Sequence, residues 1–455
     1  MSLSRSDSTA ETTRQGSGLE PRPGRPIPTP PPDRNLPDML DRARAAAAPS
    51  SSLLGRVLSS RRFQFALVVL LIFAAFIVVP WLFWLQAVEL PLNITVVDKT
   101  VPFKDRREHK ALFWLFTQNK FIDSEQPADK RWYDYREDYI GFQPIKPPDV
   151  HKETQISIPL LQNRDVLYFA DTYGVYTLDY RQFPGDIAAT KHSGIIFGGL
   201  NDQDMEAVEW FAGQGRTIIG EFNTFASPTA EQVRARMENV FGVKWTGWIG
   251  RYFVDFADEK DVPYWLFKLY KEKAGKEWDF KGSGYMLCRA ELSDFIILQA
   301  KQDLLPKGLT FDPGEPYETD DVMQGVKSST FVYWFDVVTT QPGSEVLATY
   351  NWRLTPAGRE KLAERGLPLS MPAVTRKPGK YTAYYMSGEF LDFNKSMGQP
   401  NSRLTMYINR SFYGKPVAGS AGYPFWHSGY PLITNILRRE SNRLYGIPEN
   451  VYLFK

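Results

Sequence analysis

The longest apolar run in the chain is FALVVLLIFAAFIVVPWLFWL, residues 65 to 85, and it contains no charged side chain. At about 1.5 Å per residue, a helix of this length spans the roughly 30 Å apolar core of a bilayer. A long polar stretch precedes the run, and no clear small-residue cleavage site follows it. The pattern therefore predicts a transmembrane signal-anchor helix over residues 63–88 rather than a removed signal peptide or a buried core helix.

The polar residues on either side of this run predict its orientation. Arg56, Arg61 and Arg62 lie just before it, whereas Glu89 and Asp98 beyond it are opposed only by Lys99. The positive-inside rule then places the N-terminus in the cytoplasm and the main part of the chain outside it. Residues 1–60 are rich in Pro, Ser, Arg and Ala and lack apolar periodicity, so we expect a disordered cytoplasmic tail.

Beyond residue 90, short apolar runs alternate with stretches of helical periodicity. The expected helices are 107–121, 202–215 and one that opens at Ser227-Pro228 and closes before Gly242. The expected strands are 92–98, 165–171, 193–199 and 216–222, with further strands at SGYMLC and DFIILQA. Alternation of this kind predicts an α/β fold with a doubly wound, mostly parallel sheet over residues 90–300.

Residues 301–455 continue this pattern less regularly. STFVYWFDVVTT and VLATYNWRLT are strand-like, LTPAGREKLAERGLPL is helical, and YTAYYMSGEFLD is another apolar run. We expect this region to complete or cap the same domain, with a small separate lobe as the alternative.

Unusual polar residues follow the predicted strands. In an open parallel sheet, ligands bind outside the carboxyl ends of the strands, so residues at several strand ends meet at one edge. The sequence therefore predicts one shared acidic and aromatic crevice. The residues concerned, in chain order, are Asp98, Lys99, Asp171, Tyr173, Glu221, Asn223 and Glu389.

The segments IIFGGL, GRTIIGEFN and FGVKWTGWIGRYF, each pair separated by a predicted helix, resemble the class I glutamine amidotransferase-like fold, a flavodoxin-like α/β sandwich. They are also similar to segments of membrane-anchored bacterial proteins that share VDKTVP, REH and TGWIGRYF. This resemblance covers about half of the chain and implies a location in the bacterial inner membrane. Amidotransferases carry a G-x-C-x-G elbow, whereas this chain has G-E-F-N-T, and Cys288 lies inside an apparent strand. Cysteine-dependent glutamine hydrolysis is therefore not expected.

Carboxylates are the strongest candidates for chemistry. Glu221 at the mouth of an apolar sheet is a candidate general acid, because burial disfavours its charged form, and Asp171 or Glu389 is the candidate ionised partner. Two carboxylates across a cleft are the minimum for glycoside hydrolysis. The structural alternative is that Glu221 caps a helix, pairs with Arg251 or binds backbone amides.

Other candidates would bind a ligand rather than react with it. Trp248, Arg251 and Tyr252 offer an aromatic platform beside a cation, and the aromatic-acidic stretch 131–144 is expected to be a loop that covers sugar faces or plugs a groove. Glu108 and His109 open the first helix near the end of the first strand. The four histidines show no metal-ligand spacing, so neither a metal nor another cofactor is expected.

Composition narrows the function further. The net charge is only +2, which argues against a nucleic-acid partner, and the single cysteine rules out an intrachain disulfide. The sequence thus predicts a membrane-anchored protein that binds or assembles cell-envelope carbohydrate, or holds an envelope assembly partner, through its crevice. A carbohydrate-active hydrolase is the alternative.

Overall fold

The computed structural model describes residues 60–180, 194–225, 227–314, 320–393, 395–417 and 419–447. The expected N-terminal tail lies outside these residues. The chain divides into two compact units, Met1–Phe73 and Ala74–Lys455. The first unit is described only from residue 60, where it forms the beginning of helix α3 (Arg61–Gln86), and the second contains all the sheets.

Helix α3 is 26 residues long, with a mean hydropathy of 2.9 in its apolar window, and none of that window is buried. Among the described residues it is the one helix long and apolar enough to cross a membrane. Its end belongs to the second unit, where Trp84 is buried and its Nε1 donates to the carbonyl of Gln118 at 3.1 Å. Lys120 secures the same end by donating to the carbonyls of Leu85 and Ala87.

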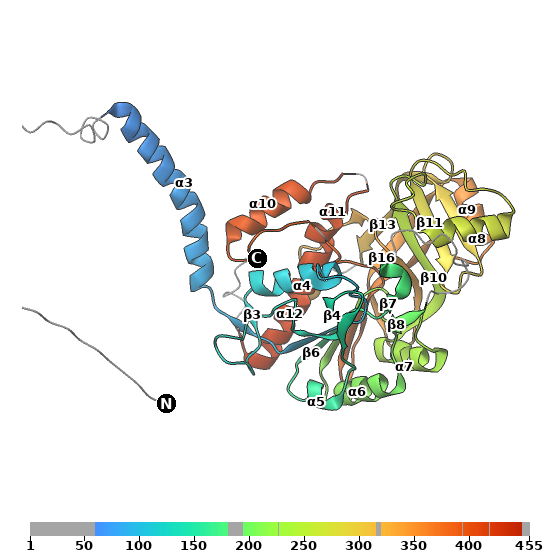
Figure 1. Ribbon diagram of the computed structural model, residues 1–455, viewed down its shortest axis with the longest axis horizontal. Coiled ribbons are helices and arrows are strands. Elements are labelled where there is room, and N and C mark those ends of the chain that lie inside the picture. The colour runs from blue at the N-terminus through green and yellow to red at the C-terminus, as the bar shows by residue number, and fades with distance from the viewer. Residues whose placement is uncertain are drawn as a thin grey trace, which may run out of the picture. The chain divides into compact units, whose positions relative to one another are not determined.

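A ten-stranded mixed sheet forms the centre of the second unit (Figure 1). Five neighbouring strands, β18, β9, β6, β2 and β4, are parallel, and antiparallel strands extend the sheet on both sides. In spatial order the strands are β14 (Ser329–Thr330), β13 (Leu304–Pro313), β16 (Glu345–Leu354), β17 (Ser370–Lys377), β18 (Thr382–Met386), β9 (Thr217–Gly220), β6 (Val166–Asp171), β2 (Ile94–Asp98), β4 (Tyr139–Lys146) and β5 (Val150–Glu153).

Helices cover both faces of this sheet, as a doubly wound arrangement requires. Alternation along β6 sends Tyr168 into one hydrophobic cluster and Leu167 with Phe169 into the other. The first cluster includes side chains of α4 (Arg107–Gln118) and α12 (Tyr430–Tyr445). The second includes those of α5 (Ile158–Leu161), α6 (Asp202–Gly213) and α7 (Glu231–Phe241).

A separate four-stranded antiparallel sheet corrects part of the sequence prediction. It consists of β12 (Phe295–Gln299), β11 (Gly284–Arg289), β10 (Val243–Phe253) and β15 (Phe335–Thr340), and α8 (Tyr264–Ala274) follows β10. SGYMLC and DFIILQA therefore belong to this sheet and not to the parallel one, and WTGWIGRYF forms most of β10. Apolar runs of this length predict strands but do not reveal their partners.

Three further expectations differ from the structure. The strand expected at 193–199 is β8 (Ile195–Phe197), which pairs only with β7 (Val175–Tyr176) in a two-stranded ribbon. The stretch 131–144 is a loop only up to residue 138, and β4 begins at Tyr139. Helix α7 begins at Glu231, after Ser227-Pro228. In each case short-range pattern left the boundary or the pairing open.

The chain beyond residue 300 adds five strands to the large sheet, and β18 pairs in parallel with β9. The remaining elements are β1 (Leu90–Pro91), β3 (Phe121–Ile122), η1 (Thr177–Tyr180), η2 (Asp321–Met323), α9 (Pro356–Ala363), α10 (Arg403–Tyr413), α11 (Gly422–Pro424) and η3 (Phe425–Gly429).

Gly141 is required where β4 pairs with the end of β2. It has φ +145°, and a Cβ there would lie 1.7 Å from the carbonyl oxygen of Asp98. We expect Gly141→Ala to lower the free energy of unfolding by about 3 kcal/mol, because backbone must move to admit the methyl group. Gly213→Ala is the control, since no atom lies within 4 Å of its added Cβ. Equal urea midpoints for the two variants would contradict this account.

Candidate functional site

Four acids that the sequence predicted to meet do lie at the same edge of the sheet. Asp98 and Asp171 end β2 and β6 and lie opposite each other after a register shift between these strands, and Glu221 directly follows β9. Glu389 follows β18, the parallel neighbour of β9 on its other side. The parallel direction of these strands is what brings their carboxyl ends together.

Asp98 and His109 form a fully buried pair at this edge. Asp98 Oδ2 lies 2.6 Å from His109 Nδ1, and His109 Nε2 lies 2.8 Å from the carbonyl oxygen of Tyr135. Because a carbonyl only accepts, Nε2 carries a hydrogen. The contact between Asp98 and His109 fastens α4 to β2 and leaves His109 no free nitrogen for a ligand.

Asp171 is held by donors from its surroundings. Its Oδ1 accepts from Thr100 Oγ1 at 2.7 Å and from the amide of Tyr173 at 2.6 Å, and the Asn223 side chain also hydrogen-bonds to it. Burial raises the pKa of Asp171 to about 7, and the nearby Asp98 charge adds to the effect. Tyr173 contributes its amide, while its ring packs against Tyr176 with centroids 4.8 Å apart.

Glu221 is a buried connection rather than an open acid. The Tyr168 hydroxyl donates to Oε1, and the amides of Phe390 and Leu391 donate to Oε2 at 2.8 and 3.3 Å. Burial raises the pKa of Glu221 to about 7, against the lowering effect of these hydrogen bonds. Of the alternatives considered from sequence, binding to backbone amides is the one observed. Arg251 pairs with Asp261 instead.

Asp336 is a buried acid that sequence reasoning did not select. It lies in β15, is fully buried, and accepts a hydrogen bond from the Tyr385 hydroxyl on β18. Burial raises its pKa to about 7. The amide of Asn223, a residue with φ +64°, lies 3.4 Å from Oδ2. An acid within the apolar run FDVVTT was the available signal. We call Asp98, Asp171, Glu221 and Asp336 the inner acids.

A second group of charges lies outside the inner acids and is only partly buried. We call it the mouth cluster, and it consists of Arg107, which is exposed, and of Glu108, Arg251, Glu389 and Asp392, which are half-buried. Burial raises the pKa of Glu389, and the charges of Asp392 and Asp171 add to this. Burial likewise raises the pKa of Asp392 to about 6, while Arg107 and Arg251 oppose the shift. Among the described residues, neither of these two carboxyl groups makes a hydrogen bond or ion pair.

Glu108 is included in the mouth cluster because its carboxyl group interacts with the charges of Arg107 and Asp392. Its Oε1 lies 3.3 Å from Arg107 Nε, and its side chain is 16% exposed. Burial raises its pKa, and the charge of Asp98 adds to the effect.

Aromatic rings border the mouth cluster, but they are not those expected. Trp334 is half-buried, stacks on Phe222 with centroids 6.1 Å apart, and lies under the Arg251 guanidinium at 5.6 Å. Burial raises the pKa of Tyr333, and the charges of Asp392 and Glu389 add to this effect. Neither Tyr333 nor Trp334 was selected from sequence, because they precede β15 in an apolar run.

Trp248 and Lys99 are corrections to the expected ligand-binding set. Trp248 is 2% exposed in β10, with the Arg289 guanidinium 5.1 Å from its ring, so it offers no platform. Lys99 is 1% exposed, and its three hydrogens go to Asp204, Gln155 and the carbonyl of Gly199 at 2.7 to 2.8 Å. Both side chains are buried in contacts within the domain, so neither is available to a ligand.

Tyr252, the third aromatic or cationic residue of the expected platform, remains partly accessible. It is half-buried and packs edge-on against Tyr285, with ring centroids 5.0 Å apart. Its ring is thus occupied by protein contacts on that side.

The described residues contain no group of three or more His, Cys, Asp or Glu side chains placed to hold a metal ion. Cys288 is fully buried in β11, and burial raises the pKa of its thiol. It is therefore unsuited to form a nucleophilic thiolate.

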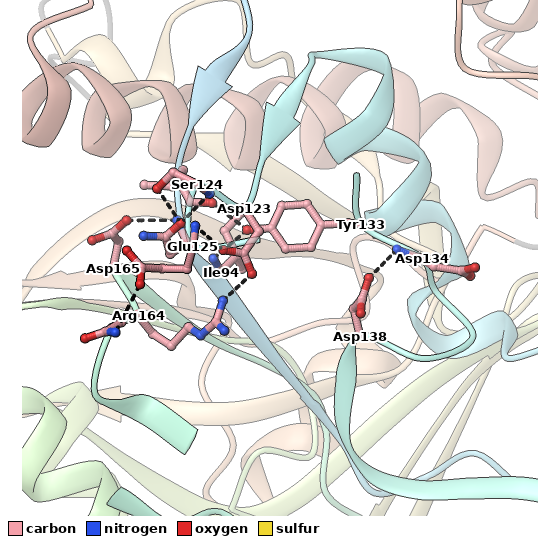
Figure 2. A network of polar contacts seen from close by, with 12 residues as sticks. Ile94, Asp123, Ser124, Glu125, Tyr133, Asp134, Asp138, Arg164 and Asp165 are labelled. Carbon is pink, nitrogen blue, oxygen red and sulfur yellow. Dashed lines mark hydrogen bonds and ion pairs between the residues drawn. The ribbon is translucent and has the colours of Figure 1, made fainter. Parts of the chain in front are cut away.

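A polar cavity of about 180 Å³ lies near the start of β2, away from the acids at its end. Figure 2 shows the network beside it, in which Arg164 pairs with Asp123 and the Tyr133 hydroxyl accepts from the amide of Ile94. The Asp138 carboxylate there accepts from the amide of Asp134 at 2.6 Å. These groups satisfy one another and secure the loop that contributes Tyr135 to His109.

The inner acids predict a specific pH dependence. An acid whose folded pKa lies above its unfolded value binds its proton more tightly when folded, so its stabilising contribution is lost as pH rises through the folded pKa. For Glu221 this window runs from the ordinary glutamate pKa of 4.5 to about 7. Glu221→Gln should therefore gain stability relative to wild type between these values, by up to about 1.4 kcal/mol per pH unit.

The measurement is urea unfolding of both proteins across this range, with Glu360→Gln on exposed α9 as the control. Asp336→Asn provides a second buried variant with the same expectation, should the first fail to fold. Parallel stability curves for wild type and both variants would contradict the assignment.

No known family model and no curated protein matches the sequence. Solved structures that resemble it include the cytoplasmic protein STM3548 of Salmonella typhimurium, at 9% identity and a TM-score of 0.34, over 76% of this chain and 98% of that one. A ThuA-like protein of Bacteroides uniformis has 9% identity and a TM-score of 0.31, and the match covers 74% of this chain and 97% of that one. The cytoplasmic protein STM1381 of Salmonella typhimurium LT2 has 10% identity and a TM-score of 0.29, and the match covers 62% of this chain and 74% of that one. Likenesses this weak carry no argument about the function of this chain.

Proposed function

We propose that this protein is a single-pass membrane protein whose α/β domain binds cell-envelope carbohydrate at the mouth cluster. One observation carries the binding proposal. The half-buried carboxyls of Glu389 and Asp392 have no hydrogen-bonding partner among the described residues, yet they lie within the fields of Arg107 and Arg251. Groups that are partly desolvated without a protein partner are suited to receive a ligand's hydrogen bonds.

The chemistry of the mouth cluster favours a polyhydroxylated ligand. Carboxylates accept from hydroxyl groups and guanidinium groups donate to them, with charge-assisted hydrogen bonds in both directions. Trp334 adds an aromatic ring, whose apolar face suits the C–H face of a sugar. A sugar polymer combines paired hydroxyls with such a face, and a protein held at a bacterial inner membrane would meet one in the envelope.

A hydrolase is the second candidate function, with Glu389 in place of Glu221 as the general acid. Both oxygens of Glu221 are engaged by Tyr168 and by backbone amides, so it is poorly placed to deliver a proton. Glu389 is half-buried and makes no hydrogen bond among the described residues, and burial with the charges of Asp392 and Asp171 raises its pKa, which suits it to hold and deliver a proton. In this version Glu389 donates the proton and Asp171 or Asp392 is the ionised partner.

Binding is tested with the purified full chain on a glycan array, followed by calorimetry on the glycans it retains. We expect Glu389→Gln and Asp392→Asn each to weaken binding by about tenfold or more, since a lost hydrogen bond to a charged group costs about 1.5–3 kcal/mol. Trp334→Ala should also weaken binding, because it removes the aromatic face that contacts the sugar. Glu360→Gln should bind as wild type. Release of new reducing ends would favour the hydrolase. The absence of binding to any glycan would remove the carbohydrate proposal.

The anchor is tested separately by accessibility in intact cells. Glu360→Cys places a thiol on exposed α9, whereas the native Cys288 is buried. We expect a membrane-impermeant maleimide to label this variant in spheroplasts without lysis, and the protein to stay in the membrane pellet after an alkaline carbonate wash. Labelling that requires lysis would place the domain in the cytoplasm and overturn the orientation.

A further inference from the structure

Helix α10 presents its apolar side outward. Of its eleven residues only Met406 and Asn409 are buried, whereas Phe412, Tyr407 and Ile408 are 72%, 60% and 44% exposed. A surface helix of a globular protein normally turns its apolar stripe toward the core and its polar side to water. The reversed arrangement indicates that something other than water covers this face.

The orientation of α10 is fixed by contacts on its inner side. Asn409 Nδ2 donates to the carbonyl of Met397 at 2.6 Å, and Ser402 caps the helix by accepting from the amide of Leu404 at 3.1 Å. Arg410 Nη2 lies 3.1 Å from Nδ1 of His427 in η3. Because these bonds hold α10 in place, its exposed side chains cannot turn inward without breaking them.

The stretch of chain that contains α10 carries charged side chains of one sign only, although Arg439 on α12 pairs with Asp321. From residue 393 to residue 439 the sequence contains no Asp or Glu. The same stretch contains the cations Lys395, Arg403, Arg410, Lys415, Arg438 and Arg439. Arg403 and Lys415 are exposed at the two ends of the outward face. Aromatic and aliphatic side chains flanked by cations match a bilayer surface that carries anionic headgroups.

A short hydrogen-bonded path connects α10 to the end of the apolar helix. Trp84 Nε1 donates to the carbonyl of Gln118, and Gln118 Nε2 donates to the carbonyl of Ser402, both at 3.1 Å. The N-cap of α10 is therefore two hydrogen bonds from Trp84, near the last turn of α3. Tryptophan at the end of a membrane span marks the interface with water.

We infer that the outward face of α10, formed by Tyr407, Ile408 and Phe412, lies in the headgroup layer of an anionic membrane. The inference rests on the proposed anchor, because α3 would bring this face to the bilayer. It goes beyond anchoring: a second contact holds the domain at one orientation, whereas a single span would leave it free to rotate. A second copy of the chain is the competing occupant of this face.

Ser411 is suited to report on the contact, since it is exposed and lies between Tyr407 and Phe412 on the outward face. The full chain carrying Cys288→Ala and Ser411→Cys is labelled with an environment-sensitive fluorophore and placed in vesicles of phosphatidylglycerol and phosphatidylethanolamine. We expect a blue-shifted emission that loses most of its intensity when the acyl chains are brominated. A label at Glu360→Cys should keep its intensity. When Ile408→Ser and Phe412→Ser are added to the Ser411→Cys protein, the label should no longer be quenched in brominated vesicles, because the outward face has lost its apolar side chains.

The outcomes separate this inference from the anchor. In one outcome the protein resists carbonate extraction while the labels at Ser411→Cys and Glu360→Cys are both unquenched. That result would overturn the role of α10 and leave the anchor intact. Protein that washes off the membrane would overturn the anchor. Self-quenching at the Ser411 position that rises with protein density, without quenching by bromine, would assign the face to a second copy and overturn the inference.

Discussion

The structure depends on how buried carboxyl groups are satisfied at one edge of the large sheet. None of the inner acids is paired with Lys or Arg, and a buried charge without a partner is strongly disfavoured. Each instead receives donors from a different element: His109 on α4, Thr100 after β2, Tyr168 with two amides after β18, and Tyr385. These bonds fasten the helix, the loops and the small sheet to the parallel strands.

The inner acids and the mouth cluster differ in how many carboxyl oxygens remain available to a ligand. Asp98 and Glu221 use both carboxyl oxygens in hydrogen bonds within the fold, whereas Asp336 uses Oδ2 and its Oδ1 has no partner among the described residues. Burial, rather than a substrate, raises the pKa values of Glu221 and Asp336. Glu389 and Asp392 keep their oxygens open beside two guanidinium groups. A perturbed pKa is therefore not sufficient to identify a functional acid here, and hydrogen-bond engagement is what distinguishes the two groups.

The mouth cluster and α10 would act together if the domain is held at a membrane. A binding site fixed at one orientation meets a surface-bound polymer with less loss of rotational freedom than a site on a freely turning domain. The path from Trp84 through Gln118 to Ser402 supplies the rigid connection that such an arrangement needs. Membrane attachment would then be part of how the site finds its ligand.

The sequence by itself determined the apolar span, the alternation of strands and helices, and the gathering of Asp98, Asp171, Glu221 and Glu389 at one edge. These follow from local periodicity and from the geometry of parallel strands, whose carboxyl ends share an edge. Only the tertiary structure decided which acids are open, which sheet each strand joins, that Trp248 is buried, and that α10 faces outward. Those outcomes depend on partners more than a hundred residues apart, such as Glu221 with Phe390, which no local pattern encodes.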